Sequence, residues 1–322
     1  MIFLEEGNAL LSLIIPVYLN AGSLPELLHS ISNIDNALEE ELEVVFVVDG
    51  SPDNSYQILK KSLADKQFKS QLILLSRNFG SFIATRTGLQ LSTGERFAVM
   101  AADLQEPPEL VLEMNKKLLT EDLDVVVGVR ESRADPLLSK LSSKIFWWVY
   151  KKYVIPEMPT GGVDMFACNK QFRDVLLTLE ERHSSLISQL FWIGFNRGVV
   201  SYKRRKRQHG KSAWTLRKKI TYLMDSVFSF TDLPIRLLVR TGAIGTILAG
   251  LYGIFVLISR ILGVITLPGY SMTIFTILFF SSLNLLGIGI IGSYAWRTYE
   301  NTKNRPISIP MKIDHFRGKH VR

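Results

Sequence analysis

The chain of 322 residues contains a single cysteine, Cys168. One thiol cannot form a disulfide within the chain, so the sequence excludes a disulfide-stabilised fold and fits a reducing compartment. A basic stretch is missing from the first residues, where Glu5 and Glu6 stand instead, and we expect no cleavable signal peptide. The five histidines show no metal-ligand spacing, which argues against a zinc protein. Internal repeats and low-complexity segments are also absent.

Charge is missing from two long stretches near the C-terminus. Nineteen residues between Arg240 and Arg260, and 36 residues between Arg260 and Arg297, carry no charged side chain. A membrane-crossing helix needs about 20 predominantly apolar residues. We therefore predict two transmembrane helices, at about 239–262 and 272–296. A pair of buried helices in a soluble protein is the alternative, but too little sequence remains to cover such a pair.

The net charge of +8 is unevenly distributed along the chain. Residues 1–202 carry 19 Lys and Arg against 26 Asp and Glu, whereas residues 203–240 carry 11 against 2 and residues 297–322 carry 7 against 2. Positive flanks stay on the cytoplasmic side of a membrane, so both ends of the hairpin are predicted to be cytoplasmic. The same residues fit the anionic head groups of a lipid bilayer. Nucleic acid is the rival partner for the basic run at 203–207, but no nucleic-acid-binding motif accompanies it, and we expect none to bind.

Short apolar runs alternate with helical patterns in the first 130 residues. Strands are predicted at 10–17, 42–48, 71–75, 96–101 and 123–129. Helices are predicted near 24–38, 53–66, 81–92 and 107–120. This alternation is typical of an α/β fold whose mainly parallel sheet is covered on both faces. Ligands of such sheets bind at the carboxyl ends of the strands.

The remaining residues predict further elements and a division of the chain. Helices are expected at 136–153, over a pair between 170 and 193, and at 215–233, with a strand at 197–204. The last of these helices is amphipathic and lies just before the first apolar span, where it fits a bilayer surface. We expect an α/β domain at 1–204, a basic juxtamembrane segment at 205–235, two transmembrane helices at 236–297 and a basic cytoplasmic tail at 298–322.

Four polar loops follow the first four predicted strands. They read PVYLN at 16–20, DGSPDNS at 49–55, SRNFG at 76–80 and AADLQEPPE at 101–109. One such loop could simply turn the chain and cap the next helix. Four loops at successive strand ends favour a shared ligand site, because the carboxyl ends of parallel strands meet at one edge of a sheet.

The sequence motifs of a single protein family are found in these four loops and in two further segments. One segment has the motif R-x-x-R-x-x-G-x-S, which ends at Ser212, and the other has R-x-x-E-x-x-x-x-R-P, which follows the second span. The chain is similar over essentially its whole length to the polyprenyl-phosphate glycosyltransferases of glycosyltransferase family two. The resemblance implies a GT-A fold, a nucleotide sugar such as a UDP-sugar as donor, and Mg²⁺ or Mn²⁺ as cofactor. It also implies inverting transfer of one sugar to polyprenyl (undecaprenyl) phosphate, by a multi-pass protein of the bacterial inner membrane whose catalytic domain is cytoplasmic. The sugar itself and the oligomeric state are not determined, although self-association fits the hairpin.

The resemblance assigns roles to individual residues by motif. Donor binding is implied for Pro16, Tyr18, Asp49, Ser51, Arg77, Asn78, Gly80, Ala101 and Asp103. Acceptor or phosphate binding is implied for Arg130, Lys140, Ser143, Arg204, Arg207, Lys211 and Ser212. Metal binding is implied for Asp103 and Gln105, and catalytic roles for Asp103, Asp164 and Arg207. Asp164 would orient the lipid phosphate or accept a proton, with capping of the chain after two glycines as the alternative.

The chain departs from the family pattern at two acidic positions and one basic position. Val48 and Ala101 stand where the motifs D-D-G-S and D-x-D begin, and Lys140 supplies the charge that is usually an arginine. Mg²⁺ keeps several waters and substrate phosphates as ligands, so Asp103 and Gln105 can suffice, with low affinity for free metal. A degenerate transferase that serves as a nucleotide-sugar-binding scaffold for a flippase is one alternative. A processive synthase is another, but its Q-x-x-R-W signature is absent.

Overall fold

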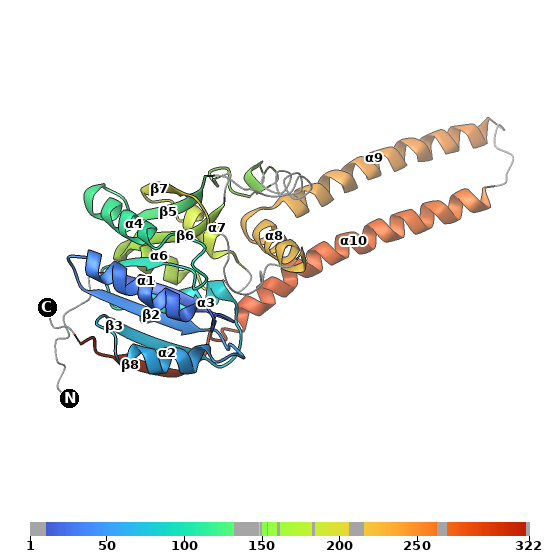
Figure 1. Ribbon diagram of the computed structural model, residues 1–322. Coiled ribbons are helices and arrows are strands. Elements are labelled where there is room, and N and C mark those ends of the chain that lie inside the picture. The colour runs from blue at the N-terminus through green and yellow to red at the C-terminus, as the bar shows by residue number, and fades with distance from the viewer. Residues whose placement is uncertain are drawn as a thin grey trace.

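A mixed β-sheet occupies the centre of the α/β domain in the computed structural model (Figure 1). The structure describes residues 11–131, 148, 150–152, 154–159, 162–181, 184–205, 216–262 and 269–319. Within them, eight strands run in the order β7-β5-β6-β4-β1-β2-β3-β8. Their bounds are β1 Leu11–Val17, β2 Leu42–Val48, β3 Lys69–Leu75, β4 Arg96–Val99, β5 Val125–Arg130, β6 Val163–Asn169, β7 Arg197–Tyr202 and β8 Pro310–Phe316.

Helices cover both faces of this sheet. The helices of the described residues are α1 Leu24–Ala37, α2 Ser55–Leu63, α3 Ser81–Leu91, α4 Glu109–Thr120, α6 Lys170–Thr178, α7 Leu186–Trp192, α8 Leu216–Phe230, α9 Leu233–Ile261 and α10 Tyr270–Thr302. Side chains of α1, α2 and α4 pack on one face, and side chains of α3, α6 and α7 on the other. The predicted α/β fold is confirmed.

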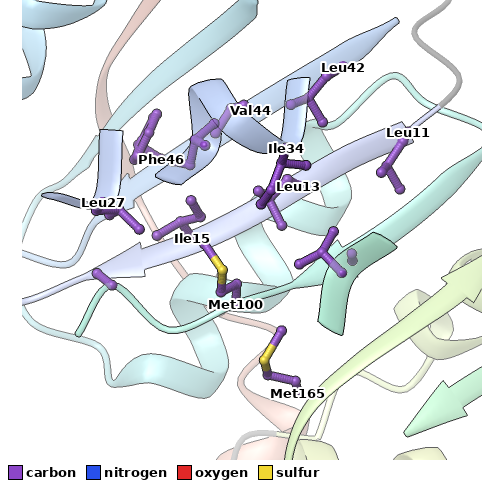
Figure 2. Packing of buried hydrophobic residues seen from close by; sticks show 14 of the residues in the cluster. Leu11, Leu13, Ile15, Leu27, Ile34, Leu42, Val44, Phe46, Met100 and Met165 are labelled. Carbon is purple, nitrogen blue, oxygen red and sulfur yellow. The ribbon is translucent and has the colours of Figure 1, made fainter. Parts of the chain in front are cut away.

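The alternation of side chains along a strand explains why the central strands are apolar at most positions. Leu13 and Ile15 of β1 point toward α1, where they lie near Leu27 and Ile34 (Figure 2), whereas Ile14 belongs to the core on the opposite face. Successive strand residues face opposite sides, so a strand covered on both faces is apolar at most positions. The buried polar residues Ser12 and Glu43 are joined by a hydrogen bond of 2.5 Å. This mostly apolar pattern is why the sequence locates the early strands to within about two residues.

Two strands are not predicted by the sequence. β6 pairs antiparallel with β4 and β5, so the sheet is mixed. The alternation of strands and helices along the sequence predicts parallel pairing instead. β8 pairs antiparallel with β3, so part of the segment expected as a basic tail at 298–322 is an edge strand of the sheet. Tyr56 of α2 donates a hydrogen bond of 2.5 Å to Asp314 of β8, which anchors this strand to the domain.

The helices α9 and α10 extend away from the domain (Figure 1). Two 24-residue segments, Leu233–Val256 and Phe279–Thr302, are long and apolar enough to cross a membrane. They overlap both spans predicted from the sequence, with each helix continuing beyond the apolar stretch. Side chains along both helices are mostly exposed.

The helix α8 connects the apolar pair to the α/β domain. The ring of Tyr222 in α8 stacks on the ring of Tyr150 at a centroid distance of 6.1 Å, and the Tyr222 hydroxyl accepts a hydrogen bond of 3.0 Å from Ser185. On the other side, Arg297 of α10 donates a hydrogen bond of 2.7 Å to Asp225 of α8. The predicted amphipathic helix at 215–233 is therefore present as α8, and it contacts both the domain and α10.

Candidate functional site

The loops after β2 and β3 are held together by a buried carboxylate. Asp49 is only 2% exposed, and its two oxygens accept hydrogen bonds of 2.7 Å from the Phe79 amide and 2.8 Å from the Gly80 amide. Burial raises the pKa of Asp49, while the two amides and the nearby Arg77 oppose that rise. The described structure gives Asp49 the role of fixing the β3 loop. Its expected contact with a nucleotide stays a prediction.

Gly50 allows these two loops to approach each other closely. Its φ angle is +57°, and a Cβ atom added there would lie 2.3 Å from the backbone carbon of Arg77. A side chain at this position would collide with backbone that cannot move aside easily. The glycine of the DGS motif is therefore required by loop packing, independently of any ligand.

Ser51 joins the loop after β2 to the loop after β1. Its hydroxyl accepts a hydrogen bond of 2.8 Å from the Leu19 amide and donates one of 2.7 Å to Asp53. Asp53 in turn accepts a hydrogen bond of 3.0 Å from the Ala21 amide. Burial works to raise the pKa of Asp53, but the hydrogen bonds from Ser51, Ser55 and Ala21 outweigh it and lower that pKa. Ser51 thus orders the predicted donor side, and its contact with the donor stays a prediction.

Other predicted donor-binding residues line the same edge of the sheet. Tyr18 is 37% exposed just beyond the end of β1, whose penultimate residue is Pro16. The exposed guanidinium of Arg77 lies 4.1 Å from the centre of the Phe79 ring, and Asn78 between them is exposed too. These side chains and the half-buried Ala101 are accessible to a ligand.

The loop after β4 carries the predicted cation ligands, and the end of β7 is attached to it. The Asp103 carboxylate is half-buried and accepts a hydrogen bond of 3.2 Å from the Gln105 amide. The Gln105 side-chain oxygen accepts one of 2.8 Å from Arg204, and its main-chain oxygen accepts another of 2.8 Å from the Arg205 amide. The turn passes through Leu104 at a φ of +54°, a conformation that few leucines adopt.

Asp164 forms an ion pair with another predicted residue. Arg130, at the end of β5, donates two hydrogen bonds to its carboxylate, and the Tyr202 hydroxyl donates one of 2.6 Å. Burial works to raise the pKa of Asp164, but Arg130 and Tyr202 outweigh it and lower the pKa. Asp164 lies within β6, so the alternative that it caps a loop after two glycines is wrong. An ionised carboxylate with this partner is better suited to orienting groups than to accepting a proton.

Glu106 is a site residue that the sequence does not reveal. It is 1% exposed, and its Oε1 atom lies 3.6 Å from the Arg204 guanidinium. Burial, followed by the charges of Asp164 and Asp103, raises the pKa of Glu106 to about 7. Its Oε2 atom has no hydrogen-bond partner among the described residues. Position 106 precedes two prolines, which explains a turn but says nothing about burial.

The loop after β4 contains oxygen atoms of the kind that hard cations bind, but the described side chains alone do not form a complete coordination shell. Across the part of the chain that the structure describes, no group of three His, Cys, Asp or Glu side chains could hold a metal. Asp103, the Gln105 amide oxygen and the unpaired Glu106 oxygen supply donors of the kind that Mg²⁺ and Mn²⁺ prefer. Substrate phosphates and water supply further ligands in many magnesium sites. The residues present fit such a cation.

Several predicted phosphate-binding residues lie outside the described residues. They are Lys140, Ser143, Arg207, Lys211 and Ser212. Their roles, including the catalytic role expected of Arg207, stay predictions. Asp103, Gln105, Arg130, Asp164 and Arg204, by contrast, are brought into one connected group with Glu106.

An α/β domain with a mixed sheet, an acidic loop after β4 and ordered loops at the neighbouring strand ends defines a GT-A glycosyltransferase. Residues 12–177 match the family model of glycosyl transferase family 2, and the chain belongs to this family. The resemblance inferred from the motifs is therefore confirmed, and the protein is a transferase.

Known relatives match the chain over almost its full length. The uncharacterized glycosyltransferase YkcC of Bacillus subtilis is 32% identical over 312 residues, which cover 96% of each chain. The undecaprenyl-phosphate 4-deoxy-4-formamido-L-arabinose transferase of Aeromonas hydrophila is 31% identical over 304 residues, covering 92% of this chain and 91% of the relative. The bactoprenol glucosyl transferase of Shigella phage SfX is 28% identical over 297 residues, covering 92% and 97%.

Proposed function

We propose that the protein transfers a single sugar from a nucleotide sugar, such as a UDP-hexose or a modified UDP-sugar, to undecaprenyl phosphate. The reaction takes place at the cytoplasmic face of the bacterial inner membrane, inverts the anomeric carbon and serves cell-envelope glycan or lipid modification. The names of two relatives, an undecaprenyl-phosphate sugar transferase and a bactoprenol glucosyl transferase, support this acceptor.

One observation carries the proposal. The group formed by Asp103, Gln105, Arg130, Asp164 and Arg204 lies in a domain that α8 attaches to two long apolar helices. Arginines at a strand edge suit phosphate groups, because the planar guanidinium donates several hydrogen bonds at once. A membrane-anchored domain with such an edge is suited to an acceptor whose phosphate lies at a bilayer surface.

The acceptor chemistry explains why a strong general base is not required. A phosphate monoester has a second pKa of about 6, so most of the acceptor is dianionic near neutral pH. One of its oxygens forms a bond to the anomeric carbon while the bond from that carbon to the nucleotide diphosphate breaks. Asp164, whose pKa is lowered, orients Arg130 and Tyr202 rather than removing a proton. The positive charges of Arg130 and Arg204 stabilise the negative charges of the acceptor phosphate and of the leaving diphosphate.

A divalent cation would assist departure of the nucleotide. Asp103 and Gln105 would hold it, and when bound it supplies a positive charge that stabilises the leaving diphosphate. Arg204 lies beside these ligands, so this chain contributes a further positive charge at the same edge.

The basic residues of the juxtamembrane region support the proposed placement. Residues 203–240 carry 11 Lys and Arg against 2 acids and flank the start of the first apolar helix. Each such residue near an anionic surface contributes about 1 kcal/mol to binding. This attraction would keep the carboxyl edge of the sheet close to the lipid head groups.

Transfer can be measured directly. Membranes that contain the protein are incubated with radiolabelled UDP-sugars and undecaprenyl phosphate in the presence of Mg²⁺ or Mn²⁺, and the lipid is extracted. We expect labelled lipid with one donor, a loss of at least tenfold for Asp103→Asn, and wild-type transfer for Glu109→Gln, whose carboxylate pairs with Arg205 on the surface. No labelled lipid with any common donor would contradict the proposal.

A nucleotide-sugar-binding scaffold is the second candidate function. The observation that favours it is the replacement of two family acids by Val48, which is fully buried, and Ala101. Cation-dependent binding of a UDP-sugar without any labelled lipid, measured on the same preparation, would support the scaffold instead of the transferase.

A further inference from the structure

The side chains of Glu106 and Gln105 converge on one guanidinium. The Arg204 Nη2 atom donates a hydrogen bond of 2.8 Å to Gln105 Oε1 and lies 3.6 Å from Glu106 Oε1. Gln105 comes from the loop after β4, whereas Arg204 follows β7, so the contact joins segments about a hundred residues apart in sequence. The group therefore depends on the tertiary fold and not on a local turn.

The Glu106 carboxyl group has few partners for a buried acidic side chain. Its side chain is 2% exposed, its Oε1 atom lies beyond hydrogen-bond distance from Arg204, and its Oε2 atom has no hydrogen-bond partner among the described residues. Burying a carboxylate oxygen without a partner costs free energy, so such an atom calls for an explanation. The negative charges of Asp164 and, to a smaller extent, Asp103 also act on Glu106 and make the arrangement less favourable still.

A divalent cation would satisfy this arrangement. It would make direct bonds to hard oxygen atoms, including the Glu106 oxygen that has no partner among the described residues, and it would offset the negative charge of the carboxylates. The chain also lacks the acid that the family motif places at position 101, where it has Ala101. A carboxylate from elsewhere in the same loop can make up for this loss of charge.

We propose that Glu106 is a further ligand of the divalent cation, and that Arg204 occupies the position beside Glu106 and Gln105 until the cation arrives. The inference rests on the proposed function, because that function supplies the reason for a cation. When the cation binds, the Arg204 guanidinium leaves Gln105 and becomes available to a phosphate group. Cation binding and phosphate binding are then coupled through one side chain.

The test measures Mn²⁺ binding by the full-length protein in detergent, without donor or acceptor, from the electron paramagnetic resonance signal of free Mn²⁺. We expect Glu106→Gln to weaken binding by about tenfold or more, since even loss of a residue that only supports a metal ligand commonly costs this much. Glu106→Asp should bind more tightly than Glu106→Gln because it keeps the charge. Arg204→Gln should bind Mn²⁺ more tightly than the wild-type protein, because the competing cation is gone.

Glu109→Gln is the matched control, since it removes the same charge from a side chain that is 72% exposed and paired with Arg205. It should bind Mn²⁺ as the wild type does. Equal affinities for Glu106→Gln and Glu109→Gln would overturn the ligand assignment, and an unchanged or weaker affinity for Arg204→Gln would overturn the role of Arg204. The readout needs no sugar transfer, so a protein that binds Mn²⁺ as expected but transfers no sugar contradicts the proposed function alone.

Discussion

Arg130 and Asp164 lie on the neighbouring antiparallel strands β5 and β6, and the guanidinium donates hydrogen bonds to both carboxylate oxygens. Both side chains are largely buried, at 13% and 24% exposed. Removal of one partner leaves the other as an unpaired charge that is largely shielded from water. Loss of either partner alone is therefore expected to destabilise the domain as well as to disturb the site.

For this pair we expect Asp164→Asn and Arg130→Gln each to destabilise the domain by about 3 kcal/mol, the lower end of the range for a buried pair, because both side chains stay partly exposed. The double variant should cost clearly less than the sum, because neither residue is then left as an unpaired charge. Thermal unfolding of the detergent-solubilised proteins measures all three changes. Strictly additive losses would show that the two side chains do not depend on each other.

A substitution at Gly50 tests whether the loops after β2 and β3 must pack closely against each other. Gly50→Ala should destabilise the domain and weaken binding of a UDP-sugar, because the new methyl group would meet the Arg77 backbone. Gly194→Ala is the control: its φ is also positive, at +82°, but no atom lies within 4 Å of an added Cβ. Both changes carry a backbone cost of about 1 kcal/mol. Thermal unfolding and nucleotide-sugar titration should therefore show a larger loss for Gly50→Ala, and equal losses would contradict a packing role.

Asp314 links the stability of β8 to pH. A hydrogen bond from Tyr56 lowers the pKa of Asp314, against an opposing effect of burial and with help from Lys60. A folded-state pKa below the unfolded value of about 3.9 stabilises the fold above that pH, and the contribution disappears as pH falls through the folded-state value.

Unfolding temperatures measured between pH 7 and pH 3 should show this contribution as a difference between proteins. We expect Asp314→Asn to be less stable than the wild type at pH 7 and the difference to shrink below about pH 4. Tyr56→Phe should behave in the same way, since it removes the donor of the hydrogen bond. A difference that grows toward acid pH would contradict the assignment.

The proposed membrane topology predicts which positions a membrane-impermeant maleimide reaches. Cys168 is fully buried, and burial raises the pKa of its thiol, so the wild-type protein should stay unlabelled. Gly269→Cys, between α9 and α10, should react in intact cells once the outer envelope is permeable to the reagent. Met311→Cys in β8, whose position is 56% exposed, should react only after the inner membrane is opened. Labelling of Met311→Cys before that step would reverse the orientation.

The apolar pattern alone determines much of the fold. β1 and β2 are mostly apolar because both of their faces are covered, and the periodicity of the flanking segments locates α1, α3 and α4. The long uncharged stretches predict α9 and α10 for a similar reason, since lipid tolerates few charges. In each case the signal is local, because the pattern of apolar residues within one element reflects which of its sides are covered by protein or lipid.

β6 and β8 could not be predicted because their pattern depends on distant partners. β6 contains Asp164 and follows two glycines, which locally favour a loop, and its polar residue is accepted only because Arg130 lies across the strand pair. β8 alternates exposed apolar and charged residues, and it becomes a strand because β3 offers an unpaired edge. The hydrogen bond between Tyr56 and Asp314 spans 258 residues of sequence.

The sequence by itself determined the family, the strand-end loops and most of the residue types at the site, because motifs and hydrophobic periodicity are properties of neighbouring residues. Only the tertiary structure decided that Asp49 and Ser51 bind other loops, that Asp164 is paired and that Glu106 is buried beside Arg204. Burial and charge pairing depend on segments that meet only when the chain folds, and so does the pKa of each carboxylate.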